Sequence, residues 1–187
     1  MTIVEAIKVM EETNSVERAM EVCKECNDEI VQLMLEKYKK EILMDITPQD
    51  HPVVYIVGGQ NASGKSKLIT TLGEKNKKSV YIAIDNMKAH HPFRNVVNRR
   101  FTNDSEKLLH LACFDVFNKL FNQLLKEGYN LVIERTLGKK DKSHEYVKMA
   151  SKYNYDVQIH VTATHELNSL VQSLERFIIE ARTSRYI

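Results

Sequence analysis

Residues 59–66 read Gly-Gln-Asn-Ala-Ser-Gly-Lys-Ser, which matches the phosphate-binding pattern G-x-x-x-x-G-K-[ST] at every specified position. Residues 53–57, just before the loop, are mostly β-branched and apolar, as in a buried parallel strand. Residues 65–72, at the other end of the loop, can open a helix. A strand, a glycine loop and a helix N-terminus aim backbone N–H groups and the positive end of a helix dipole at one point. This context argues against a chance glycine turn and predicts a site for a nucleoside triphosphate.

The type of each loop residue predicts how the nucleotide is held. Lys65 is expected to reach the β- and γ-phosphates, and the hydroxyl of Ser66 is expected to hold Mg²⁺. ATP and Mg²⁺ are therefore the expected cofactors. The predicted nucleotide-binding residues are Gly59, Gln60, Asn61, Ala62, Ser63, Gly64, Lys65 and Ser66.

The composition predicts a soluble globular protein. The 187 residues are 43% hydrophobic and 28% charged, which suits one well-packed domain. No apolar run has the length of a membrane span, and residues 1–8 lack the basic and apolar regions of a signal peptide. Three cysteines, an odd number, suggest reduced thiols. The expected location is cytoplasmic, with no membrane partner.

Cys23 and Cys26 form a CxxC pair, which is compatible with a redox or zinc site. No second ligand pair at metal spacing exists, and the surrounding sequence is helical and rich in glutamate. We therefore expect two ordinary thiols one helical turn apart. Cys113 lies in an apolar helical stretch and is expected in the core.

The charge is divided unevenly along the chain. Residues 1–52 carry twelve acids and six bases, whereas residues 53–187 carry 13 acids and 21 bases. A basic body suits a phosphate-rich ligand, and nucleic acid would be attracted for the same reason. Basic and aromatic residues do not interleave as a groove for single strands requires. Nucleic acid is therefore the weaker prediction.

Hydrophobic periodicity predicts helices at the N-terminus and alternating strands and helices after it. Residues 3–12 and 15–44 have apolar positions at helical spacing, and residues 47–52 form a linker with two prolines. The alternation after the linker predicts an α/β fold, a P-loop kinase-like sandwich with a parallel central sheet. Expected strands are 53–57, 79–84, 130–134 and 156–162, and expected helices are 65–74, 104–127, 141–153 and 165–182. The predicted domains are a small helical segment, 1–47, and a P-loop kinase domain, 53–187.

Two acids stand at the expected ends of strands. Asp85 follows residues 79–84, and Glu134 ends residues 130–134. The carboxyl ends of parallel strands meet at one edge of a sheet, so both acids are expected near the glycine loop. Phosphoryl transfer uses a carboxylate that accepts a proton from the acceptor hydroxyl or orients Mg²⁺. The alternative for each acid is a helix cap or a solvated turn.

Three stretches resemble the zeta-toxin family of P-loop kinases. Residues 85–92, Asp-Asn-Met-Lys-Ala-His-His-Pro, are similar to the family's D-x-[FL]-R-x-x-H-P. Residues 132–137, Val-Ile-Glu-Arg-Thr-Leu, look like its strand that ends in E-G-T-L-R, and residues 58–66 fit its G-G-Q-x-x-x-G-K-[ST]. The stretches occur in the family's order, and the resemblance covers residues 53 to about 187.

The resemblance implies a kinase that uses ATP and Mg²⁺ to phosphorylate a nucleotide sugar, as the toxin of a toxin–antitoxin system. In the best-known members the acceptor is the 3′-hydroxyl of UDP-N-acetylglucosamine, and the product poisons cell-wall synthesis. It further implies that Asp85 is the general base and that Lys65 is catalytic as well as nucleotide-binding. Arg176 resembles the arginine of the family's R-[YF] helix, and Arg185 resembles a second, lid-like arginine near the triphosphate. The implied substrate-binding residues are Lys88, His91, Glu134 and Thr136.

The sequence departs from the family pattern at three places. Lys88 replaces an arginine and so loses the bidentate fork. Arg135 and Gly138 stand where the family has glycine and arginine, so a substrate contact is missing or displaced, and Lys139 or Lys140 could compensate. The sequence ends two residues after Arg185, so a C-terminally shortened member is expected. The alternatives are a catalytically weak or inactive nucleotide-binding relative and a P-loop kinase for another small molecule, such as a nucleoside or an antibiotic.

The N-terminal helices suggest a partner or a substitute for one. Toxins of the family are usually held inactive by a separate small helical antitoxin that covers the ATP site. The expected partner is such an antitoxin in trans, or residues 1–47 in cis, where an acidic helical segment precedes a basic body. The alternative is that residues 1–47 form a plain structural cap.

Overall fold

The computed structural model describes residues 1–60, 62–75, 78–135 and 140–180. The chain forms two compact units, each built from two separate stretches of sequence. Unit 1 comprises residues 1–45 and 82–123, and unit 2 comprises residues 46–81 and 124–187. The predicted domains, 1–47 and 53–187, divide the chain by expected function and stay a prediction.

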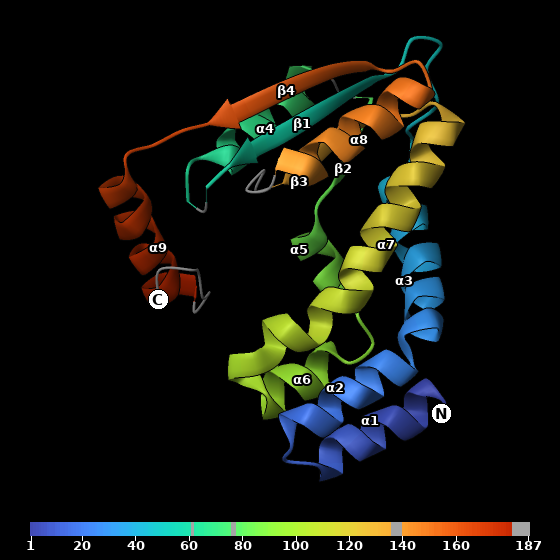
Figure 1. Cartoon of the computed structure of the whole chain (residues 1–187), viewed down its shortest axis with the longest axis vertical. Coiled ribbons are helices and arrows are strands. Elements are labelled where there is room, and N and C mark those ends of the chain that lie inside the picture. Colours follow the sequence, from blue (N-terminus) through green and yellow to red (C-terminus); the bar gives the residue numbers. More distant parts are fainter. Residues whose placement is uncertain (61, 76–77, 136–139, 181–187) are drawn as a thin grey trace. The chain divides into compact units, whose positions relative to one another are not determined.

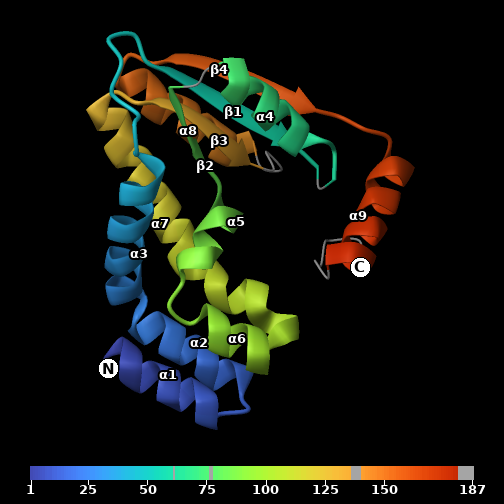
Figure 2. The same cartoon turned by 180° about the vertical axis from the view of Figure 1, so that it is seen from behind.

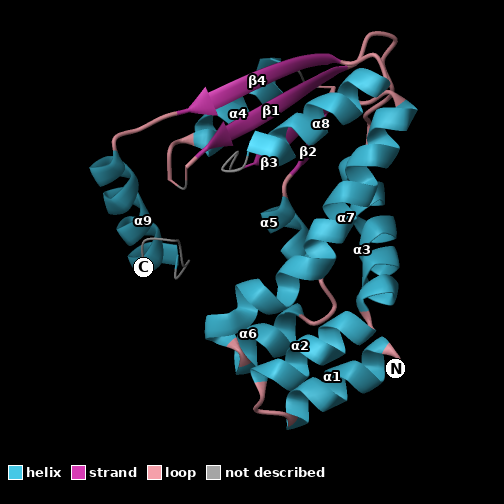
Figure 3. Cartoon of the chain, in the orientation of Figure 1, coloured by secondary structure: helices cyan, strands magenta, loops and turns pink. Residues whose placement is uncertain are grey.

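Unit 2 is built around a four-stranded sheet with strand order β2-β3-β1-β4, drawn in magenta in Figure 3. The central strand β1 pairs in parallel with both neighbours, so that Val54 lies opposite Leu131 on one side and Val157 on the other. The bounds are β1 (Val53–Gly59), β2 (Ser79–Ile82), β3 (Asn130–Arg135) and β4 (Asp156–Thr162). This sheet confirms the predicted α/β fold class.

Helices α4 (Lys65–Lys75) and α8 (Lys140–Lys152) cover opposite faces of this sheet. The crossover from β1 to β2 passes β3 in one direction, and the crossover from β3 to β4 passes β1 in the other. Because such crossovers are right-handed, opposite directions place the two helices on opposite faces (Figures 1 and 2). Helix α9 (Glu166–Glu180) follows β4.

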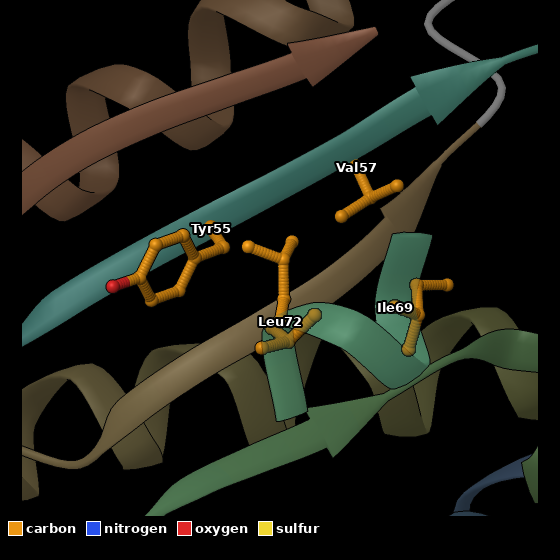
Figure 4. Close-up of a cluster of buried hydrophobic side chains, with 5 residues drawn as sticks. Tyr55, Val57, Ile69 and Leu72 are labelled. Atoms are coloured by element: carbon orange, nitrogen blue, oxygen red, sulfur yellow. The ribbon is translucent and has the colours of Figure 1, made fainter. Parts of the chain in front are cut away.

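The inner face of α4 packs on β1 and β3. Ile69 and Leu72, three residues apart and therefore on one face of the helix, meet Tyr55 and Val57 of β1 and Val132 of β3 (Figure 4). All residues of β1 after the first are buried, because helices cover the sheet on both sides. The glycine loop therefore leaves from a rigid strand and enters a helix that is packed against that strand.

Unit 1 is helical. Its first three helices are α1 (Ile3–Glu12), α2 (Val16–Glu25) and α3 (Asn27–Ile42). They pack with α5 (Ile84–Met87), the 3₁₀ turns η1 (Lys88–His90) and η2 (Thr102–Asp104), α6 (Arg94–Arg100), and α7 (Ser105–Glu127) as far as residue 123. Among the described residues, no helix is both long enough and apolar enough to cross a membrane.

Two predicted elements differ from the structure. The single helix expected over residues 15–44 is two helices that meet at Cys26, whose backbone (φ −98°, ψ 3°) leaves the helical region. The strand expected over residues 79–84 ends at Ile82, and a short helix follows. Apolar spacing predicts which residues are buried, but it does not predict where a chain turns. Cys23, Cys26 and Cys113 are free thiols, and all three are buried, as was predicted for Cys113.

Candidate active site

The glycine loop follows β1 directly, and its path depends on two glycines with positive φ, Gly59 at 149° and Gly64 at 87°. At Gly59, a Cβ atom would meet the side-chain hydroxyl of Thr162 and would lie 2.5 Å from the Thr162 carbonyl oxygen. Only glycine therefore allows the loop to pass this close to the end of β4.

Polar side chains join the loop to the residues at the end of β4. The hydroxyl groups of Ser63 and Thr162 are 2.6 Å apart, and Gln60 Nε2 donates to the carbonyl of Thr164 at 2.9 Å. Thr162 is absent from the predicted site residues, although it ends a strand at the same edge of the sheet. The strand-end rule that selects Asp85 and Glu134 would also have selected it.

Lys65 is buried in the loop, with 8% of its surface exposed. Its Nζ donates to the carbonyl oxygens of Gly59 at 3.1 Å and Gln60 at 2.7 Å. The same atom lies 3.9 Å from Glu134 Oε1. The lysine and the strand-end acid thus lie together at one edge of the sheet, the arrangement that the parallel topology predicts. The ammonium group is therefore held inside the loop by two of its carbonyl oxygens.

Tyr81 fixes the other carboxylate oxygen of Glu134. The phenol donates a 2.7 Å hydrogen bond to Glu134 Oε2, while Oε1 faces Lys65. Tyr81 is likewise absent from the predicted site residues. Its only sequence signal is a polar-tipped aromatic residue in an otherwise aliphatic strand, which is too common to identify a site.

In unit 1, Asp85 lies in the short helix α5 and forms an ion pair with Lys88 at 2.7 Å. Lys88 Nζ also contacts the carboxylate of Glu106 on α7. Burial lowers the pKa of Lys88, but its hydrogen bonds to the two carboxylates outweigh that effect, so the pKa is raised. The ammonium therefore stays charged and joins two carboxylates that are themselves largely exposed. Glu106 is a further residue of this cluster that the sequence did not single out.

His91 is 4% exposed and packs beside the ring of Phe93. Its Nδ1 accepts the backbone N–H of Phe93 at 3.1 Å, whereas its buried Nε2 has no partner among the described residues. Burial lowers the pKa of His91 to about 4, so the ring is neutral near pH 7 and carries its proton on Nε2. The structure places this side chain inside unit 1.

The remaining predicted residues are only partly described. Asn61, Thr136 and Arg185 lie outside the described residues, and Arg176 lies in α9 without a described side chain. Ser66 is exposed in the first turn of α4. The described residues hold no cluster of three or more His, Cys, Asp and Glu that could bind a metal ion.

Arg135, which stands where the resemblance leads us to expect glycine, does not point freely into solvent. Its guanidinium lies over the ring of Tyr146, 4.9 Å from the ring centroid. Burial lowers the pKa of Arg135. This cation therefore packs against α8.

Comparisons with known proteins identify the family. The family model described as zeta toxin matches residues 37–187. Toxin zeta of Streptococcus agalactiae is 28% identical over 145 residues, which are 76% of this chain and 50% of that protein. Toxin zeta of Streptococcus pyogenes is 27% identical over 140 residues, 74% of this chain and 48% of that protein. The chain spans about half the length of these curated relatives.

Solved structures share the fold. A structure from the PezAT chromosomal toxin–antitoxin system of Streptococcus pneumoniae superposes with a TM-score of 0.75 and 23% identity, over 81% of this chain and 65% of that chain. A structure of AvrRxo1-ORF1:-ORF2 with ATP gives a TM-score of 0.51 and 14% identity, over 85% of this chain and 49% of that chain.

Proposed function

The chain belongs to the zeta toxin family, and from this premise we propose that it is an ATP-dependent kinase that phosphorylates a hydroxyl group of a nucleotide sugar. UDP-N-acetylglucosamine is the first acceptor to test. The observation that carries the proposal is the glycine loop of unit 2, where the buried ammonium of Lys65 lies beside Glu134. A buried, charged lysine at a loop of this kind is the group that phosphoryl transfer requires.

The loop residues fit a nucleotide with its magnesium ion. The loop has no Cβ at its tightest point, Gly59, and α4 begins at Lys65, so a helix N-terminus faces the loop. Lys65 Nζ now bonds two loop carbonyls, and it can exchange these for phosphate oxygens. The exposed hydroxyl of Ser66 is the proposed Mg²⁺ ligand. When bound, Mg²⁺ neutralises charge on the phosphates.

The chemical step needs a base and several cations. We assign to Asp85 the removal of the proton from the acceptor hydroxyl, whose oxygen then bonds the γ-phosphorus as the bond to the departing ADP oxygen breaks. Arg176 and Arg185 would balance the negative charge on the phosphoryl group. Glu134 and Thr136 would bind the sugar.

Lys88 and His91 are the other proposed substrate-binding residues. Lys88 pairs with Asp85 and can turn toward an anionic group of the substrate. The burial of His91 supports an indirect role instead, because its Nδ1 already holds the backbone of Phe93 in place.

The biological role we propose is that of a toxin controlled by an antitoxin. The curated relatives carry the name toxin, and the pneumococcal structure comes from a toxin–antitoxin system. A small helical antitoxin in trans is the proposed partner. Inhibition in cis by residues 1–47 remains the second proposal, but contacts within unit 1, such as Asn27 with Asp115 at 2.8 Å, favour a structural role for this segment.

The deciding experiment offers the folded chain ATP, Mg²⁺ and a panel of nucleotide sugars, and measures product masses. We expect one added phosphoryl group on a UDP-sugar, and no product with Asp85→Asn. Transfer to a nucleoside or an antibiotic alone would contradict the acceptor but not the kinase. Tight ATP binding without transfer to any acceptor would contradict the kinase and favour an inactive nucleotide-binding relative.

A further inference from the structure

Helix α3 places a buried tyrosine against the helical turn that carries Asp85. Tyr38 is 3% exposed, its ring packs against that of His90, and the side chain of Asn86 and the backbone of Ala83 interact with its hydroxyl. Burial raises the pKa of Tyr38 to about 12, so the phenol is neutral at physiological pH. The hydroxyl thus forms a polar link between two segments that are more than forty residues apart in the sequence.

The two partners of this hydroxyl lie on either side of Asp85. Ala83 is the residue before α5, and Asn86 follows Asp85 within it. Helix α5 has four residues and no side-chain cap at its N-terminus. A helix this short has almost no stability of its own, so its geometry depends on what holds it from outside.

The same face of α3 also contacts the next turn of the chain. The rings of Tyr38 and His90 are 5.1 Å apart and tilted by 56°. Glu41, one turn after Tyr38, has its Oε2 3.5 Å from His90 Nε2. Helix α3 therefore contacts the stretch 83–90 near its beginning, its middle and its end, at Ala83, Asn86 and His90. Tyr38 takes part in all three contacts, and Glu41 takes part in the last.

We propose that Tyr38 is a positioning residue that holds the Asp85 carboxylate in place for proton transfer. The inference rests on the proposed function, and it assigns to α3 a supporting part in the kinase reaction. A general base acts only within hydrogen-bond reach of its proton, and small displacements of reacting groups lower rates steeply. Tyr38 does not belong to the glycine loop, so its hydroxyl should affect the chemical step and not ATP binding.

The test compares Tyr38→Phe with a matched control, Tyr155→Phe. Both substitutions delete one buried hydroxyl; that of Tyr155 donates to the carbonyls of Leu124 and Tyr129 in unit 2. We expect Tyr38→Phe to speed amide hydrogen exchange in residues 83–90 about tenfold and to lower kcat about tenfold, with an unchanged Kd for ATP. Tyr155→Phe should leave exchange in residues 83–90 at the wild-type rate.

Asn86→Ala provides a second variant that keeps Tyr38 intact. Because the Asn86 side chain interacts with the Tyr38 hydroxyl, the effects of the two substitutions on exchange should be less than additive. Additive effects, or wild-type exchange in Tyr38→Phe, would overturn the inference. Faster exchange with an unchanged kcat would reduce Tyr38 to a structural residue and also overturn it. If the chain shows no turnover, the proposed function fails. Amide hydrogen exchange in residues 83–90 then still tests whether the Tyr38 hydroxyl holds the turn, so the two failures are distinguished by different measurements.

Discussion

At the scale of single residues, the buried ammonium of Lys65 has the clearest expected effect. Lys65→Met keeps the length of the side chain but removes the charge, and it leaves the carbonyls of Gly59 and Gln60 without their donor. We expect the Kd for ATP, measured by calorimetry, to rise by about two orders of magnitude. Lys67→Met is the matched control, an exposed position of α4 where the Kd should stay the same. Equal effects of both substitutions would contradict a specific phosphate contact.

The lowered pKa of the buried His91 side chain predicts how the stability of the fold depends on pH. Its pKa is lowered to about 4 in the folded chain, whereas an unfolded histidine titrates near 6.5. Between these values the unfolded state binds more protons, so stability is complete above pH 6.5 and is lost as the pH falls toward 4. The loss from pH 7 to pH 4.5 should be roughly 2 kcal/mol.

The substitution that isolates this effect is His91→Asn, because an asparagine oxygen can accept the Phe93 N–H that Nδ1 now accepts. Urea unfolding at pH 7 and at pH 4.5 should show a smaller loss in the variant than in the wild type. An equal loss in both would mean that other groups cause the acid sensitivity.

At the scale of elements, the loop and helix α4 contain glycines with opposite roles. Gly59→Ala forces a Cβ into Thr162 at a positive φ, so we expect a loss of roughly 1–3 kcal/mol in stability and weaker ATP binding. Gly73 lies inside α4 with open space around the position of a Cβ. Gly73→Ala should stabilise the chain by about 1 kcal/mol, as seen in thermal unfolding, with unchanged ATP binding. Destabilisation by Gly73→Ala would mean that helix propensity does not determine the effect on stability at that position.

The elements also show what sequence can predict. The glycine loop, its strand and its helix can be predicted from neighbouring residues alone. The strand and the helix each have a characteristic hydrophobic pattern, and the loop has glycines at specified positions. Thr162, Tyr81 and Tyr38 acquire their roles only when distant segments meet, and nothing in their neighbouring residues marks this. The short helix at Asp85 was expected as the end of a strand, since apolar β-branched residues continue to Ile84. The local apolar preference therefore does not decide where β2 ends.

At the scale of the whole molecule, the first 45 residues complete the core of unit 1. Their helices contribute fully buried side chains to this core, including Met10 and Met34. Residues 82–123 contribute the buried rings of Phe93, Phe117 and Phe121. Ion pairs such as Glu11 with Arg99 at 2.8 Å join the same two stretches at the surface. The sequence predicted the helices but not that they form one unit with residues 82–123, because periodicity shows that a face is buried and not what covers it.

This arrangement separates a structural role of the N-terminal helices from an inhibitory one. Met10→Ala leaves a cavity beneath α1 and should lower the free energy of unfolding by roughly 2–5 kcal/mol. If α1 supports unit 1, and through α3 the turn of Asp85, turnover should fall as well. If residues 1–47 inhibit in cis, looser packing should instead raise turnover. Glu11→Ala, which removes only an exposed ion pair, is the control and should change stability by less than about 1 kcal/mol. Urea unfolding and kinase turnover, measured on the same preparations, decide between the two: a rise in turnover with Met10→Ala contradicts the supporting role.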